Sequence, residues 1–128
     1  MQLNISLVSD FHYTSEIRKF PINIEITSDD PVDICYPVHV TRAVLTKLDN
    51  SELWFGYAMQ VTPAKRNVIT LTSATPLRMQ ADVFEHDDDF GDLIPGEYLC
   101  EIKVSVVTIV DDKACAGDLR ESFTIMLT

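Results

Sequence analysis

The sequence has few glycines and few basic residues, and it contains no long apolar run. Its 128 residues include four glycines, three histidines and three cysteines, and ten lysines and arginines stand against twenty aspartates and glutamates. It has no glycine-rich loop that would cradle phosphates, no nucleophile elbow and no H-E-x-x-H sequence. These absences favour a protein that is not an enzyme and that uses no cofactor.

The chain also lacks the segments that direct a protein into or across a membrane. No apolar run approaches the ~20 residues that cross a bilayer. The first residues, MQLNISLVSDF, alternate in polarity, whereas a signal peptide has a basic region followed by an apolar block. We therefore expect no membrane partner and, if Met1 is the native start, a cytoplasmic protein.

The excess of acidic residues gives the chain a formal net charge of −10. Binding to nucleic-acid phosphates needs lysines and arginines concentrated on one face, so we expect no nucleic-acid partner. A strongly acidic surface keeps a protein soluble, and it would also speed the encounter with a basic protein partner.

Polar and apolar residues alternate with a period of two along most of the chain, which is the pattern of half-buried β-strands. Clusters of turn-forming residues, TSDDP and DDKACAGD among them, separate the alternating runs. A chain of 128 residues is the length of one domain. We therefore predict one all-β domain over residues 1–128, an antiparallel sandwich or barrel of about seven to nine strands. The predicted strands lie at 3–7, 22–26, 32–36, 43–48, 53–62, 68–72, 77–84, 98–110 and 122–127.

Three stretches of the sequence resemble a known family. INIEITSDDPVDI resembles the strand, polar turn with proline and short strand of bacterial immunoglobulin-like domains. LIPGEYLCEIKVSV resembles their late L-x-P-G-x-Y strand, and SFTIML resembles their closing strand. The order and spacing are similar to those of the intracellular proteinase-inhibitor type of immunoglobulin-like sandwich. The resemblance implies a single antiparallel immunoglobulin-like sandwich but no site, because no inhibitory loop can be matched residue by residue.

The spacing of Tyr98 and Cys100 is similar to that of the immunoglobulin tyrosine corner, in which a tyrosine lies two residues before the second cysteine. Cys35 lies far enough upstream to be the opposite cysteine, whereas Trp54 lies later than the usual core tryptophan. Because the cysteine count is odd and no export signal is present, we expect reduced thiols that pack as small hydrophobic groups. A Cys35–Cys100 disulfide is the alternative. We place Cys115 in a loop.

The segment EHDDDFGD, residues 85–92, concentrates acidic side chains ahead of a predicted strand. Three interpretations are open: a solvated loop, a patch that binds a basic partner through Asp87, Asp88, Asp89 and Asp92, or a calcium site. Calcium would take its oxygen ligands from Asp87, Asp89 and Asp92, joined by Asp29, Asp30 or Asp111. The spacing departs from an EF-hand loop, because Gly91 comes one position early and no glutamate stands at the twelfth position. We therefore predict that the segment binds no metal, and keep the calcium site as the alternative.

Two predicted strands carry apolar residues on both faces. In LWFGYAMQVT, Trp54 and Tyr57 are candidate anchors for a protein partner, and a central strand covered on both sides is the alternative. Val107 and Ile109 interrupt the polar face of the strand at 98–110. A homodimer sheet or an edge-strand partner would cover them.

Taken together, these features favour a non-catalytic protein-binding module. The physical type fits an inhibitor or immunity protein that occludes a basic partner through its acidic loops. The alternative is an immunoglobulin-like module whose 85–92 loop binds calcium.

Overall fold

The computed structural model describes residues 1–16, 20–36, 38–48, 53–56, 67–83 and 94–128. These residues form β-strands and no helix, so the described part of the chain has no helix that could cross a membrane. The strands are β1 (Gln2–Leu7), β2 (Phe20–Thr27), β3 (Val32–Tyr36), β4 (His39–Lys47), β5 (Leu53–Gly56), β6 (Asn67–Leu71), β7 (Leu77–Val83), β8 (Gly96–Val110) and β9 (Lys113–Leu127).

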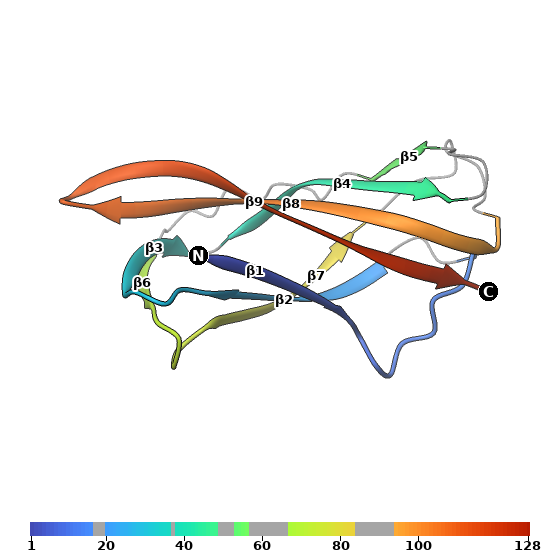
Figure 1. The fold of residues 1–128 in the computed structure, drawn as a ribbon, viewed down its shortest axis with the longest axis horizontal. Helices are drawn as coiled ribbons and strands as arrows, with labels where there is room; N and C mark the ends of the chain where they lie inside the picture. Colours follow the sequence, from blue (N-terminus) through green and yellow to red (C-terminus); the bar gives the residue numbers. More distant parts are fainter. Residues whose placement is uncertain (17–19, 37, 49–52, 57–66, 84–93) are drawn as a thin grey trace.

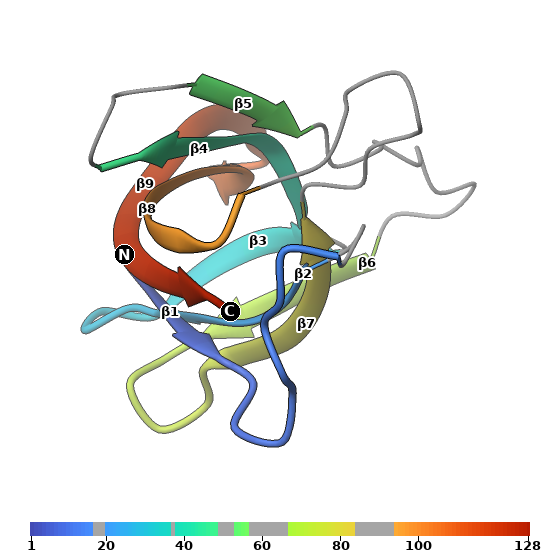
Figure 2. The same cartoon turned by 90° about the vertical axis from the view of Figure 1, so that its right-hand side faces the viewer.

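The strands form two antiparallel sheets (Figures 1 and 2). Sheet A has the order β1-β2-β7, and sheet B has the order β5-β4-β8-β3-β6 with β9 on the other side of β8. The 15-residue strand β8 organises sheet B: one edge pairs with β4 and then β3, and the opposite edge pairs with β9 along its whole length. The predicted all-β, antiparallel architecture is therefore confirmed.

The two sheets share one hydrophobic core, which forms where their inner faces meet. The alternation in β2 buries Ile22, Ile24 and Ile26, while Asn23 points to the outer face. The alternation in β8 buries every second residue from Tyr98 to Val106. Burial of apolar area contributes about 25 cal/mol per Å², so these inner faces hold most of the stability of the fold.

The segment before β2 is fastened by Tyr13. Its hydroxyl donates a hydrogen bond to the Pro21 carbonyl (2.5 Å) and accepts one from the Val8 amide (3.0 Å). Its ring stacks on the buried Phe20, with centroids 6.2 Å apart. Thr128 pairs its backbone with this segment, so the end of β9 is held against the loop that joins β1 to β2.

The prediction for DDKACAGD was wrong in one respect. We expected a loop that included Cys115, but only Asp111 and Asp112 form the turn, and β9 begins at Lys113. The two aspartates have φ angles of 51° and 61°, the left-handed region that a two-residue hairpin turn requires and that aspartate tolerates better than most residues. Cys115 therefore lies on a strand, paired with Thr108.

Candidate functional site

Most of the predicted partner-binding residues lie outside the described residues. Asp87, Asp88, Asp89 and Asp92 belong to the undescribed range 84–93, and Tyr57 to the undescribed range 57–66. Trp54 lies in β5, paired with Leu45 of β4, and its side chain is outside the described set. The acidic patch, the calcium alternative and the aromatic anchors therefore stay predictions.

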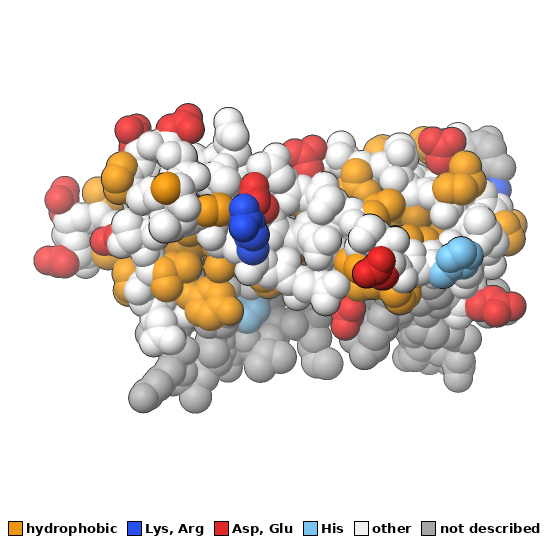
Figure 3. Space-filling model, turned by 90° about the horizontal axis from the view of Figure 1, so that it is seen from below, with side chains coloured by type: hydrophobic (Ala, Val, Ile, Leu, Met, Phe, Trp, Pro, Cys, Tyr) orange, Lys and Arg blue, Asp and Glu red, His pale blue; other side chains and the backbone are white. Residues whose placement is uncertain are grey.

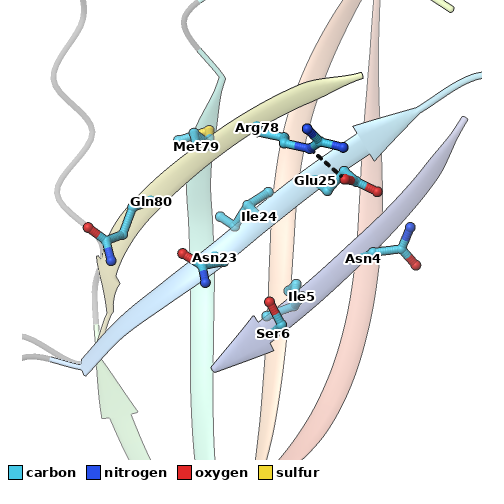
Figure 4. Close-up of a pocket in the computed structure, with 9 residues that line it drawn as sticks. All are labelled: Asn4, Ile5, Ser6, Asn23, Ile24, Glu25, Arg78, Met79 and Gln80. Atoms are coloured by element: carbon cyan, nitrogen blue, oxygen red, sulfur yellow. Dashed lines mark hydrogen bonds and ion pairs between the residues drawn. The ribbon is translucent and has the colours of Figure 1, made fainter. Parts of the chain in front are cut away.

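The outer face of sheet A carries a depression of about 550 Å³ (Figure 4). Polar side chains from all three strands of sheet A line it: Asn4, Ser6, Asn23, Glu25, Arg78 and Gln80. Seen from this side, the middle of the molecule is mainly neither charged nor hydrophobic, and hydrophobic side chains gather toward its two ends (Figure 3).

One ion pair crosses this outer face. Glu25 and Arg78 are directly opposite each other in the β2–β7 ladder, and Arg78 Nε lies 2.9 Å from Glu25 Oε2. The Glu25 side chain is 35% exposed and the Arg78 side chain 75% exposed, so the pair is well hydrated and contributes little to stability. The lining of the depression is thus hydrated and rich in amides, and its two charged side chains are paired with each other.

The first part of β9 is the most exposed stretch of regular structure in the described chain. Every residue of Lys113–Asp118 is exposed, so both faces of the strand meet solvent there. One edge of β9 pairs with β8, and no strand of the described residues pairs with the other. The β8–β9 hairpin extends beyond the start of β1 at the left of Figure 1.

Half-buried apolar residues adjoin this edge. Val107 and Ile109 are paired with Ala116 and Ala114 of β9, and neither is fully covered. Val110, at the end of β8, is 53% exposed. The sequence pattern indicates Val107 and Ile109 but not the edge itself, because it predicts a loop over DDKACAGD. The signal that would have found it is the apolar run VVTIV followed by a two-residue turn.

The cysteines are all free, including the two proposed for a disulfide. Cys100 faces the core between Leu45 and Phe123, whereas Ile34, the neighbour of Cys35, pairs with Thr108. Cys100 and Thr108 are eight residues apart along β8, which is roughly 26 Å at ~3.3 Å per residue. Cys35 lies beside Thr108, so it is too far from Cys100 to form a disulfide. Burial, and to a lesser degree the charge of Glu101, raises the pKa of the Cys100 thiol above its usual value. The alternative of a Cys35–Cys100 disulfide is thus wrong for this structure.

Within the described ranges, no group of three or more histidine, cysteine, aspartate or glutamate side chains is placed to hold a metal ion.

Comparison with known proteins finds no matching family model, no similar curated protein and no similar solved structure. No activity can therefore be inferred from a relative, and a function has to be inferred from the sequence and the structure alone.

Proposed function

We propose that the chain is a non-catalytic protein-binding module built on an immunoglobulin-like sandwich. The strand order supports the immunoglobulin-like type. In this proposal β1, β2 and β7 would be strands A, B and E, and β5, β4, β8 and β9 would be C′, C, F and G, while β3 and β6, which pair with each other, carry no letter. The tyrosine corner adds support, because the Tyr98 hydroxyl donates a hydrogen bond of 2.6 Å to the Ile94 carbonyl, just upstream of β8.

The observation that carries the function is the open edge of β9 at Lys113–Asp118. An unpaired edge presents a row of backbone donors and acceptors, and natural proteins usually protect it with charges, prolines or a covering segment. Here four of the six residues, 114–117, are alanine, cysteine, alanine and glycine. Small side chains leave the backbone accessible, so an extended segment of a partner can add to sheet B as a further strand.

The acidic cluster takes a supporting role in this proposal. Asp87, Asp88, Asp89 and Asp92 would steer a basic partner toward the molecule, in keeping with the net charge of −10. Trp54 and Tyr57 remain candidate anchors. A cytoplasmic inhibitor or immunity protein that occludes a basic enzyme fits this combination.

The proposal is tested by affinity capture from a lysate of the native host, followed by identification of the retained protein. An Ala114→Lys/Ala116→Lys variant places two charges beside the open edge and should lose the partner that the wild type retains. A second variant, with asparagine at Asp87, Asp88, Asp89 and Asp92, should capture the same partner more slowly, because steering acts mainly on the association rate.

Val68→Lys is the matched control, because Val68 is 58% exposed on β6, another edge of sheet B. It should retain the partner. Equal capture by the wild type and the β9 variant would remove the open edge from the binding surface. Capture of no specific protein by the wild type would contradict the binding function itself.

A further inference from the structure

Three basic residues form a row across the outer face of sheet B. Arg42 of β4 is directly opposite Lys103 of β8, and Lys103 is directly opposite Arg120 of β9. Six of the ten lysines and arginines lie in the described ranges, and three of these six are in this row. Like charges directly opposite each other weaken a sheet, so this arrangement costs stability.

A β-bulge places Arg42 in the row. His39 and Val40 pair with Ser105 and Val104, and the register then shifts, so that Arg42 pairs with Lys103. Without the shift Thr41 would lie opposite Lys103, and Arg42 would lie on the core side. Bulges often redirect side chains at functional sites. The Thr41 hydroxyl donates a hydrogen bond of 3.3 Å to the Lys103 carbonyl, which fixes the bulge against β8.

The row lines a depression of about 490 Å³, together with Val44, Glu101, Ile102, Glu121 and Ser122. Within the described part of the chain, none of the three basic side chains forms an ion pair with a carboxylate. Glu101 stands one position along the same face, and Glu121 belongs to the opposite face of β9, paired with Ile102. At physiological ionic strength, charges beyond a Debye length of about 8 Å are largely screened. Asp118, opposite Ser105 in the β8–β9 ladder, lies on the same face as the row and accepts a hydrogen bond of 3.0 Å from the Ser105 hydroxyl. A ligand at the row therefore experiences mainly the three basic groups and the carboxylates of Glu101 and Asp118, and little of the overall charge.

We propose that the row Arg42–Lys103–Arg120 binds a small ligand that carries two or more linked phosphate groups. Neighbouring strands are about 4.8 Å apart, so the three strands place these residues over roughly 10 Å. A single oxyanion contacts two neighbouring members of the row and leaves the third without a partner, whereas a second linked group reaches it. The outer arginines offer planar, paired donors that suit phosphate oxygens, and the central lysine offers a compact charge.

The test is a titration of the folded protein with inorganic pyrophosphate at constant ionic strength, followed by amide chemical shifts and by calorimetry. Saturable shifts should centre on β4, β8 and β9 at the row. Lys103→Gln should weaken binding about 10-fold, as loss of one charge-assisted hydrogen bond predicts, and Arg42→Gln/Arg120→Gln should weaken it further. These side chains point to solvent, and the shift spectrum of each free variant shows whether it folds.

Arg78→Gln is the matched control, because it removes an arginine from the outer face of sheet A and should leave pyrophosphate affinity unchanged. Orthophosphate should bind more weakly than pyrophosphate. The proposal would be overturned if pyrophosphate binding did not saturate, or if Lys103→Gln bound pyrophosphate as tightly as the wild type. It would also be overturned if Arg78→Gln weakened binding as much as Lys103→Gln. Orthophosphate binding as tight as pyrophosphate would also overturn it, since a second phosphate would then add nothing.

Discussion

The outer faces of the two sheets place arginine in opposite electrostatic surroundings. On sheet A, Arg78 stands across from Glu25 and is paired with it at 2.9 Å. On sheet B, Arg42 and Arg120 stand on either side of Lys103, and none of the three has a carboxylate partner within the described residues. The face of sheet A arranges its charges in the way that stabilises a sheet, whereas the face of sheet B accepts a cost. Such a cost points to a role outside folding, because natural proteins tend to depart from structural rules at functional sites.

The comparison with the largest expected effect is between the inner and outer faces of one strand. Ile24 is 1% exposed on the inner face of β2, and its neighbour Glu25 is on the outer face. Ile24→Ala should lower the free energy of unfolding by about 2–5 kcal/mol, through lost apolar contacts and the cavity left behind. Glu25→Ala should lower it by about 0.5 kcal/mol, because the exposed ion pair is weak. Urea unfolding curves measure both, and equal losses would show that the outer face also holds the fold together.

The pH dependence of stability compares a buried thiol with an exposed one. Burial raises the pKa of Cys100 above its ordinary value of 9.0. The folded state therefore keeps the thiol proton after the unfolded chain has lost it, so this contribution is complete below pH 9 and declines as the pH rises. Unfolding curves at about pH 8 and about pH 10 should show a smaller decline for Cys100→Ala than for the wild type. The stability of Cys115→Ala, changed at an exposed position of β9, should decline between these pH values as much as that of the wild type. An equal effect of the two substitutions would contradict the assignment of this pH dependence to Cys100.

Charge reversal gives a smaller effect, with opposite signs on the two sheets. Lys103→Glu converts two repulsive cross-strand pairs into attractive ones and should raise the free energy of unfolding by about 1 kcal/mol. Arg78→Glu places a carboxylate opposite Glu25 and should lower it by about 0.5–1 kcal/mol. Thermal unfolding at low salt shows both effects most clearly, because salt screens exposed charges. The same sign for both variants would mean that the difference between the faces has no energetic consequence.

The alternation of polar and apolar residues located most of the fold in advance. Ile22, Ile24 and Ile26 are buried as their spacing predicts, and so are Tyr98 and Cys100. The prediction failed at Lys113–Asp118, where a charged and small-residue sequence was assigned to a loop although it pairs with β8. Local propensity indicates a turn there, but the ladder formed by Val107 and Ile109 continues the sheet across it.

The basic row was beyond the reach of sequence reasoning for a different reason. Arg42 and Arg120 lie just outside the predicted strands at 43–48 and 122–127, and Lys103 is an ordinary polar position of the strand at 98–110. Their meeting depends on the cross-strand register, which the bulge after Val40 shifts by one residue. A one-residue change of register moves the side chains of a strand to the opposite face of the sheet. The residues around Thr41 show no sequence pattern that predicts such a change. The acidic cluster, which is conspicuous in the sequence, lies outside the described residues and stays a prediction.

Photo-crosslinking in cells of the native host tests the binding function most directly. A photoreactive amino acid at position 116, on the open edge of β9, is compared with the same residue at position 80, in the outer-face depression of sheet A. The open edge predicts a discrete covalent adduct with one protein from position 116 and none from position 80. An adduct from position 80 alone would place the binding surface on sheet A, and adducts from neither position would contradict a protein-binding role for both faces.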